Sequence, residues 1–388
     1  MDEFFRTLAE QAAPCYVFDE DALTERMRAC REIVGPTVEL CYSIKANPFL
    51  IPAMLRCVPT LEVCSPGELE ICNALRVPPE AVLYSGVNKT AEGIARALDL
   101  GVRRFTCESC LHVRLLDEAA RARNLELPVL LRLSSGSQFG MEEAVLREIV
   151  RHRDTLPGLH IEGLHYFAGT QQKRLTGQRR QLEKLAALCD ALEREEGFAL
   201  ERVEYGAGLY LPYFEGEDED TLVPLRELAP DLARLAARVK LTVEMGRFFA
   251  GPCGTFLTRV VDVKHNAGSD IAILDSGIHH VNYYGGSMGM RVPKMRVLRD
   301  PSQTTGEPWM LCGSLCTTAD VLVRAAPVGP LAPGDALAFE HVGAYAPTEA
   351  PGLFLSRDLP RVFLLSQGHA RLVRDAVPAW QLNCPQFL

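Results

Sequence analysis

Short apolar segments alternate with longer amphipathic segments over the first 250 residues of the chain. Most of the apolar segments are bounded by glycine, proline or polar residues, which is typical of buried strands. They predict strands at residues 40–43, 61–64, 82–84, 104–106, 128–133, 160–167, 202–205 and 240–244. The segments between them have apolar residues at helical spacing and predict helices at residues 21–33, 67–75, 90–98, 108–121, 142–153, 176–195 and 221–239.

Eight strands that alternate with helices predict an α/β fold in which residues 21–250 form a (β/α)8 TIM-type barrel. A doubly wound open sheet is the alternative, because a local pattern does not show whether a sheet closes. After Gly251 the helical spacing becomes scarce, and loops rich in glycine, proline, asparagine and serine separate strand-like runs at residues 255–263, 271–275, 336–339 and 361–365. We therefore expect a second, mostly β domain made of residues 251–388 together with residues 1–20.

Composition and charge narrow the class of protein. The chain has 388 residues and a net charge of −9, so it offers no general positive field for nucleic acid or for an anionic membrane. No apolar run approaches the ~20 residues that cross a membrane, and the acidic N-terminus lacks the basic region of a signal peptide. The thirteen cysteines then predict reduced thiols, and none of them forms a set with zinc spacing. We expect a cytoplasmic protein without a metal, nucleic-acid or membrane partner.

Residues that carry chemistry follow several predicted barrel strands, at the ends where barrel enzymes place their active sites. Lys45 follows the first strand; a partly desolvated lysine there can form a Schiff base, although a surface lysine is the plainer interpretation. Glu244 ends the eighth strand and precedes Gly246 and Arg247, which suits either a capped turn or a grip on a phosphate. Glycines or hydroxyls that suit a phosphate also follow the sixth and seventh strands: Gly169, Thr170, Gly206 and Gly208.

The order of these residues resembles that of the fold-type III pyridoxal-phosphate-dependent decarboxylases, the family of ornithine, diaminopimelate and arginine decarboxylases. Segment 42–47, Tyr-Ser-Ile-Lys-Ala-Asn, resembles the family's Tyr-Ala-Val-Lys-Ala-Asn, whose lysine carries the cofactor. Segment 244–247, Glu-Met-Gly-Arg, resembles its Glu-Pro-Gly-Arg, and segment 62–68 resembles its Asp-Val-Ala-Ser-Gly-Gly-Glu. In the second domain, segments 312–316 and 343–345 resemble its Gly-Pro-x-Cys and Gly-Ala-Tyr motifs. The matches run nearly end to end and specify the family, but not one substrate.

This resemblance implies a role for each matching residue. Lys45 would carry pyridoxal 5'-phosphate, and Glu244 would keep the pyridine nitrogen protonated, which makes the ring an electron sink. Cys316 would come from the partner subunit and return a proton after carbon dioxide leaves, so the resemblance implies a homodimer with shared active sites. The residues that would surround the cofactor are Phe167, Thr170, Gly208, Gly246, Arg247 and Tyr345.

Departures from the family pattern bear on the substrate. The sixth-strand motif His-x-His-x-Gly-Ser reads His-Tyr-Phe-Ala-Gly-Thr at residues 165–170, so Phe167 replaces the histidine that stacks on the cofactor ring. A phenylalanine can still stack but cannot titrate. Thr317 and Ser276 stand where ornithine-type relatives have acids, and a free ammonium would need such an acid. Asp320 is a candidate polar contact or a helix cap. We therefore expect the distal end of the substrate to be neutral, or to be held by other residues.

Several functions stay open at this point. The first is α-decarboxylation of an amino acid with an acylated, extended or carrier-bound side chain, as in siderophore or natural-product biosynthesis. The second is an ordinary diaminopimelate, lysine or ornithine decarboxylase with a shifted pocket. A racemase is disfavoured by Glu244, because alanine racemase-like relatives pair the pyridine nitrogen with arginine. A non-enzymatic regulator is disfavoured by the retention of Lys45, Arg247, Cys316 and Tyr345, and only the loss of the stacking histidine favours it.

Overall fold

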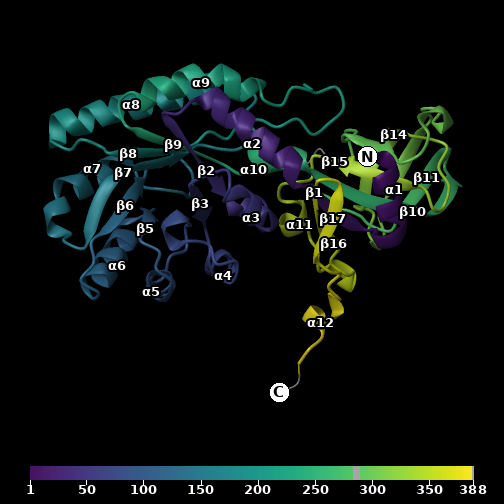
Figure 1. Ribbon diagram of the computed structural model, residues 1–388, viewed down its shortest axis with the longest axis horizontal. Coiled ribbons are helices and arrows are strands. Elements are labelled where there is room, and N and C mark those ends of the chain that lie inside the picture. Colours follow the sequence, from purple (N-terminus) through teal and green to yellow (C-terminus); the bar gives the residue numbers. More distant parts are fainter. Residues whose placement is uncertain (283–288, 387–388) are drawn as a thin grey trace. The chain divides into compact units, whose positions relative to one another are not determined.

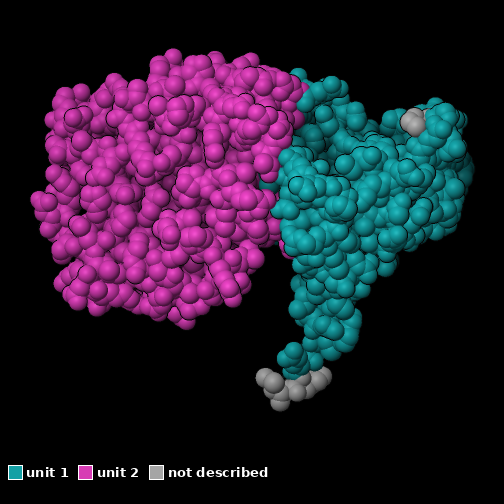
Figure 2. Space-filling view, in the orientation of Figure 1, with its two compact units in different colours: residues 1–23, 212–219, 250–388 teal, residues 24–211, 220–249 magenta. Residues whose placement is uncertain are grey.

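The chain divides into two compact units, and the computed structural model describes residues 1–282 and 289–386. What we call the first unit, drawn in magenta and labelled unit 2 in Figure 2, contains residues 24–211 and 220–249. What we call the second unit, drawn in teal and labelled unit 1, contains residues 1–23, 212–219 and 250–388. Segment 212–219 leaves the barrel sequence to join the second unit, where Phe214 pairs with Pro293. This excursion has no counterpart in the hydrophobic pattern, because a short loop has no periodicity to read.

The first unit is a closed barrel of eight strands, which confirms the predicted (β/α)8 fold and rules out the open doubly wound sheet (Figure 1). Neighbours in sequence are neighbours in the barrel, and parallel pairing of the last strand with the first closes it. The strands are β2 (Val38–Ser43), β3 (Thr60–Val63), β4 (Val82–Tyr84), β5 (Arg104–Cys107), β6 (Leu127–Arg132), β7 (Leu159–Phe167), β8 (Arg202–Gly206) and β9 (Lys240–Met245). The helices are α2 (Glu20–Val34), α3 (Ile51–Met54), α4 (Pro66–Ala74), α5 (Ala91–Asp99), α6 (Cys110–Arg121), α7 (Glu143–Arg151), α8 (Thr176–Glu196), α9 (Val223–Ala236) and α10 (Arg247–Ala250).

Capping residues determine where three of the barrel helices begin. The hydroxyl groups of Ser65, Thr90 and Ser109 accept hydrogen bonds from backbone N–H groups three residues further on, at 3.1, 3.1 and 3.3 Å. Each such cap stabilises a helix by about 1 kcal/mol, because it satisfies a donor that the helix itself leaves unpaired. The caps therefore fix the lengths of the loops that follow β3, β4 and β5, at the end of the barrel where the chemistry lies.

The second unit is built on a nine-stranded sheet, as the sequence predicts for a mostly β domain. β1 (Cys15–Asp19) lies inside this sheet, antiparallel to β10 and parallel to β16, so the N-terminal segment belongs with the C-terminal part of the chain. Helix α1 (Asp2–Ala12) packs Phe5 and Ala9 against Leu257 and Ala338 of the sheet. The other strands are β10 (Gly254–Asn266), β11 (Ser269–Leu274), β12 (Met295–Val297), β13 (Pro308–Cys312), β14 (Val321–Pro327), β15 (Ala336–Glu340), β16 (Arg361–Ser366) and β17 (His369–Arg374). Two single-turn helices complete the unit, α11 (Ala346–Glu349) and α12 (Trp380–Asn383).

Two expectations from composition can be compared with the described residues. All thirteen cysteines are free thiols. Within residues 1–282 and 289–386, no helix combines the length and the apolar character that crossing a membrane requires.

Candidate active site

Strands β2, β3, β7, β8 and β9 bring their C-terminal ends to one end of the barrel. The register sets Glu62 beside the last residue of β2, Glu244 beside Gly206, and Gly206 beside Phe167. Lys45 follows β2 directly, in a single turn of 3-10 helix that spans Ile44–Ala46. Four of the strand-end residues singled out from the sequence, Lys45, Phe167, Gly206 and Glu244, thus lie around one opening.

Lys45 combines solvent access with a fixed carboxylate partner. Its Nζ lies 2.9 Å from Glu62 Oε2 and 3.4 Å from Cys64 Sγ, and its side chain is 43% exposed while that of Glu62 is 3% exposed. Burial opposes ionisation of Glu62, but the positive charges of Lys45 and His165 outweigh it and lower the pKa of the Glu62 carboxyl. Glu62 is therefore ionised at neutral pH and orients the Lys45 amine at the rim of the barrel.

His165 orients the carboxylate of Glu244. The Nε2 of His165 lies 3.1 Å from Glu244 Oε2, and both side chains are almost fully buried. The other oxygen, Oε1, lies 2.8 Å from the point where a Cβ on Gly206 would stand, so the glycine leaves open space beside this carboxylate. Glu62, His165 and Glu244 also offer atoms within 4.8 Å of one another, a set that suits a divalent cation. Lys45 already bonds to the Glu62 carboxylate, which leaves Glu244 as the acceptor for a further N–H donor.

Two glycines allow the loops after β7 and β8 to pack backbone against backbone. Gly208 has φ +55°, and a Cβ there would lie 1.8 Å from the carbonyl oxygen of Gly169. The N–H of Gln172 donates to the carbonyl oxygen of Gly208 at 3.0 Å, which ties the two loops together. Thr170 is exposed on the first of these loops. Close backbone packing of this kind presents N–H groups to an anion without intervening side chains.

The end of β9 is packed against the turn that carries Lys45. A Cβ on Gly246 would lie 2.7 Å from Ala46 Cβ and 3.1 Å from the carbonyl oxygen of Ser43, so only glycine allows this approach. Arg247 follows at once, begins α10 and is buried. Met245 replaces the proline of the family pattern and continues β9 by one residue beyond Glu244. The turn therefore brings the backbone just before Arg247 against the turn that carries Lys45.

Phe167 stands where the family pattern has the stacking histidine. This residue ends β7 and is half-buried, and its Cδ2 would lie 2.5 Å from a Cβ on Gly206. An alanine at position 206 would therefore displace either the ring or Glu244. His165 does not take over the place of the missing histidine, because it points its Nε2 to Glu244.

Sequence reasoning overlooked Glu204, a fully buried carboxyl group of the same barrel layer. Glu204 lies on β8 beside His165 of β7, and among the described residues its carboxyl group has no polar partner other than the Cys41 thiol. Burial, together with the negative charges of Glu244 and Glu62, raises the pKa of Glu204 well above its ordinary value. The two-residue alternation of a strand gives the signal that was available, because Glu204 stands two positions before Gly206 and so faces the same side.

A second lysine, Lys89, also lies at this end of the barrel and was not singled out. It follows β4, is buried, and donates from Nζ to the carbonyl oxygen of Gly86 at 2.6 Å. Burial lowers the pKa of Lys89 to about 8, and the nearby Cys107 and Glu108 only partly oppose this shift. Its position after a barrel strand is the same signal that indicated Lys45.

The remaining predicted residues lie in the second unit. Cys316 is exposed, in the loop that follows β13, and Thr317 is half-buried beside it. Asp320 is buried, and its carboxylate accepts hydrogen bonds from the backbone N–H groups of Ile278 and Leu315, both at 2.8 Å. Burial raises the pKa of Asp320, although these two bonds oppose the shift. Asp320 therefore ties the loop of Cys316 to the segment that follows β11.

Ser276 and Tyr345 have local structural constraints of their own. Ser276 is fully buried, and its hydroxyl lies 2.7 Å from the hydroxyl of Thr258. Tyr345 has a left-handed backbone, φ +65°, immediately before α11. A non-glycine residue in this conformation is uncommon and marks a fixed turn. The Gly-Ala-Tyr segment thus has a defined shape, which bulky substitutions at Gly343 would disturb, since a Cβ there would lie 1.9 Å from the carbonyl oxygen of Ala250.

Comparison with known proteins decides the family. The sequence profile described as "Pyridoxal-dependent decarboxylase, pyridoxal binding domain" matches residues 20–251. The chain belongs to the pyridoxal-dependent decarboxylases. Among curated relatives, this decarboxylase is 26% identical to L-glutamyl-[BtrI acyl-carrier protein] decarboxylase of Niallia circulans, over 95% of the chain and 94% of the relative. It is 25% identical to diaminopimelate decarboxylase of Aquifex aeolicus, over 86% and 82% of the two chains.

Solved structures share the fold along nearly the whole chain. The diaminopimelate decarboxylase of M. jannaschii superposes with a TM-score of 0.88 at 22% identity and covers 99% of this chain and 94% of its own. A structure titled SrLDC in complex with PLP and cadaverine superposes with a TM-score of 0.77 at 24% identity, over 88% of each chain. The protein is thus a pyridoxal-phosphate-dependent carboxy-lyase, with a TIM barrel and a β domain.

The residues at the barrel end fit this cofactor. Lys45 offers an accessible amine, Glu244 has an oxygen free of His165, and the glycine-lined loops at 169 and 208 present backbone rather than side chains. Arg247 adds a buried positive charge. An aldehyde, a ring nitrogen and a phosphate each have a suitable partner in this set.

Proposed function

We propose that this decarboxylase removes the α-carboxyl group of an amino acid whose side chain is acylated, extended or bound to a carrier, in siderophore or natural-product biosynthesis. One observation carries the proposal. Asp320, the acid nearest in sequence to Cys316 and Thr317, is buried and already accepts one backbone N–H on each oxygen, which makes it a poor partner for a substrate ammonium. Ser276, where ornithine-type relatives have an acid, is buried and bonded to Thr258. The distal end of the substrate then has no carboxylate partner at these three positions.

We propose the following roles for the barrel residues. The cofactor supplies an electron sink for the pair of electrons that the departing carboxyl group leaves behind. Lys45 holds the cofactor through its amine, and Glu244 holds the pyridine nitrogen through the oxygen that His165 does not use. Phe167 packs on the ring face, and the charge of Arg247 binds phosphate. Thr170, Gly208 and Gly246 contribute backbone and hydroxyl contacts on the phosphate side.

We further propose that a second copy of the chain completes each site. Cys316 is exposed on its loop, and its Sγ–H is a proton source that a reacting carbon at an interface can reach. Thr317 and Tyr345 would come from the same partner copy. Thr317 would contact the substrate side chain, and Tyr345 would contact the phosphate. This arrangement is a homodimer with shared active sites, in which Asp320 positions the loop.

The chemistry of the reaction limits how a carrier can be attached. An α-decarboxylase of this class needs a free α-amine to join the cofactor and a free α-carboxyl to lose. A carrier must therefore be joined through the side chain, which for a glutamyl group means the side-chain carboxyl. The relative that acts on L-glutamyl-[BtrI acyl-carrier protein] supports this type of substrate.

The alternative is a diaminopimelate, lysine or ornithine decarboxylase with a shifted pocket. Its support is the number of diaminopimelate decarboxylases among the curated relatives, at 24 to 28% identity. A regulator without activity is disfavoured, because the charged residues around Lys45 and Glu244 are retained together with their partners.

Release of carbon dioxide across a panel of substrates tests the proposal. The panel contains free ornithine, lysine, diaminopimelate and glutamate, and the same glutamate as a side-chain thioester on pantetheine. We expect turnover of the thioester, with free diamino acids slower by two to four powers of ten, because an unpaired ammonium loses about 1.5–3 kcal/mol per missing charged hydrogen bond. A kcat/KM of about 10⁴ M⁻¹s⁻¹ or more for a free diamino acid would establish the alternative.

A further inference from the structure

Five basic side chains gather at the beginning of α8 and in the loop before it. Residues 173–184 contain five basic residues and a single acid, Glu183, in a chain whose net charge is −9. All five basic side chains are exposed. We call this set the basic face of α8, and it consists of Lys173, Arg174, Arg179, Arg180 and Lys184.

The basic face begins directly beside the loops of the candidate active site. Gln172, the residue before it, donates its N–H to Gly208 and pairs with Leu209 of the loop after β8. Lys173 places its Nζ 4.4 Å from the ring centre of Tyr210 on the same loop. Since α8 follows β7, the beginning of the helix lies at the end of the barrel that carries Lys45 and Glu244. The positive charge is therefore adjacent to the opening of the site.

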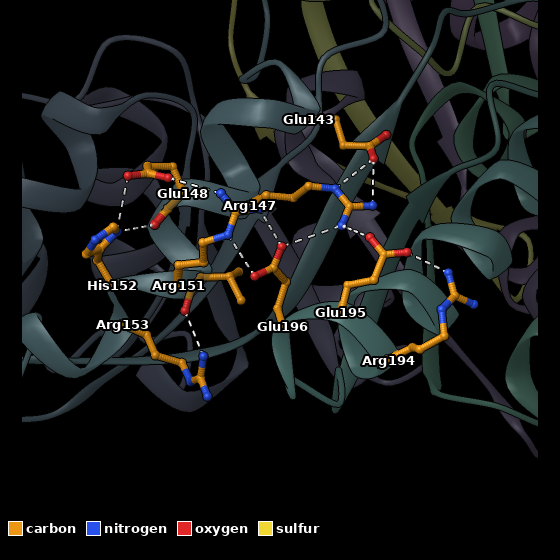
Figure 3. A network of polar contacts seen from close by, with 10 residues as sticks. Glu143, Arg147, Glu148, Arg151, His152, Arg153, Arg194, Glu195 and Glu196 are labelled. Carbon is orange, nitrogen blue, oxygen red and sulfur yellow. Dashed lines mark hydrogen bonds and ion pairs between the residues drawn. The ribbon is translucent and has the colours of Figure 1, made fainter.

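The charged residues at the two ends of α8 differ in their ion pairing. At the C-terminal end, Glu195 and Glu196 pair with Arg147 and Arg151 of α7 at 2.7 to 3.7 Å, in a network of alternating charges (Figure 3). On the basic face, Arg179 pairs with Asp231 at 3.2 Å. Arg174, Arg180 and Lys184 have no carboxylate within ion-pair distance in the described part of the chain. The network thus neutralises one end of the helix and leaves a net positive charge at the other.

The position of this charge also works against the stability of the helix. The N-terminus of a helix is the positive end of its dipole, where acidic residues are favourable and basic residues are not. α8 has no acidic residue in its first turn and no side-chain cap, whereas α2, α4, α5 and α7 each have an acid in the first turn. Charges that do not help the helix, and that lie beside the active-site opening, suit the attraction of an anionic partner.

We propose that the basic face of α8 is the docking surface for the carrier protein that presents the substrate, and that this carrier is acidic where it docks. The inference rests on the proposed function, since it assigns a surface to the carrier of the same reaction. A carrier docked beside the loop after β7 would deliver its tethered amino acid to the opening that Lys45 borders. The interaction sets encounter rate and orientation more than it sets chemistry, because exposed charges act mainly through long-range steering.

The test compares a carrier-bound substrate with a small one. The double variant Arg180→Glu/Lys184→Glu reverses two charges on the solvent side of α8, one helical turn apart. The matched control is Arg76→Glu/Arg123→Glu, which makes the same change in net charge after α4 and α6, at the opposite end of the barrel. The two substrates are L-glutamyl-[BtrI acyl-carrier protein] and the glutamyl side-chain thioester of pantetheine. Direct binding of the holo carrier protein to each variant is measured at two salt concentrations.

If the basic face docks the carrier, the α8 variant should be impaired with the carrier-bound substrate and not with the small thioester. The α8 variant should raise KM for the carrier-bound substrate at least about tenfold at low salt, and leave kcat/KM for the pantetheine thioester within about twofold, as expected for a change in steering alone. The control variant should leave both unchanged. Equal effects on both substrates, or none on carrier binding, would overturn the docking surface. Binding of duplex DNA or anionic vesicles that the α8 variant loses, without any carrier binding, would assign the surface to another polyanion. If the carrier binds through α8 but neither thioester is decarboxylated, the docking stands and the proposed function fails.

Discussion

Glu204 provides the sharpest test of the electrostatics inside the barrel. Its carboxyl group is fully buried between His165 on β7 and Thr242 on β9, and burial with the charges of Glu244 and Glu62 raises its pKa well above 4.5. We therefore predict that Glu204 holds its proton to a higher pH than an ordinary glutamate does. The substitution Glu204→Gln replaces it with a neutral amide of nearly the same size, and so changes the titration while keeping the packing.

The sign of the effect on stability follows from proton binding. Between the ordinary pKa of 4.5 and the raised pKa in the folded protein, the folded state holds a proton that the unfolded state has lost. The stability contributed by this proton is full below pH 4.5 and falls by about 1.4 kcal/mol for each pH unit above it, until the folded pKa is reached. Glu204→Gln lacks this slope. Relative to the variant, the natural protein should therefore lose unfolding free energy as the pH rises from 4.5 toward the raised pKa of Glu204.

Urea unfolding of both proteins, followed by far-ultraviolet circular dichroism, measures this difference. Tryptophan fluorescence would report on the wrong unit, because Trp309 and Trp380 both lie outside the barrel. The exposed Glu227→Gln variant is the control for loss of a glutamate on a barrel helix. We also expect Glu204→Gln to keep kcat/KM within about threefold, whereas Glu244→Gln should lose about a hundredfold or more. A difference in stability that is flat with pH would show that Glu204 is ionised and would refute the reasoning.

Four further predictions address the site residues. Borohydride reduction of the holoenzyme followed by peptide mapping should place the pyridoxyl group on Lys45, and a label on another lysine, such as the buried Lys89 at the same end of the barrel, would contradict the assignment. Mixing inactive Lys45→Ala and Cys316→Ala proteins should restore up to about a quarter of the natural activity after subunit exchange, since one site in a mixed dimer is then intact; no recovery after proven exchange would exclude a shared site. Phe167→Ala should weaken cofactor binding about two- to tenfold by loss of ring stacking, measured by titration of the apoenzyme, whereas Phe167→Leu should lose less. Asp320→Ala leaves two buried N–H groups unpaired and should destabilise the second unit by about 1–3 kcal/mol for each of them, with kcat reduced through the Cys316 loop; unchanged unfolding of that unit would show that Asp320 does not tie the loop.

The barrel is predictable from the sequence because each of its strands is buried on both faces. Such strands are short apolar runs, and the helices between them have a clear apolar side, so element order alone leads to eight βα units. Closure is a property of the whole sheet, and it depends on the pairing of β2 with β9, about two hundred residues apart. The sheet of the second unit is harder to read. β17 has little burial, β12 has three residues, and β13 begins with a proline, so none has the pattern of a buried strand.

Position at strand ends led to Lys45, Glu244 and the glycines, but the sequence could not indicate what each polar residue contacts. Asp320 illustrates the difference. Its carboxylate binds the N–H of Ile278, 42 positions away, and such a contact has no local signature. Glu204 has no motif of its own either, and its importance comes only from the two other carboxylates that the closed barrel brings near it. The roles of Asp320 and Glu204 therefore depend on contacts with residues distant in sequence, and residue type alone does not indicate them.

Such long-range contacts also explain how three glutamates can share one barrel layer. Unscreened charges of one sign repel strongly in a buried setting, so each glutamate needs a different solution. Glu62 is ionised and bonded to Lys45, and Glu244 is bonded to His165. Glu204 has only the Cys41 thiol beside it, and burial raises its pKa. Of the three, Glu244 alone combines an acceptor oxygen with open space beside Gly206. Under the proposed function, Glu244 is therefore the carboxylate that remains available to a ring N–H. Because the three glutamates interact, a change at Lys45 or His165 should also alter the pKa of Glu204.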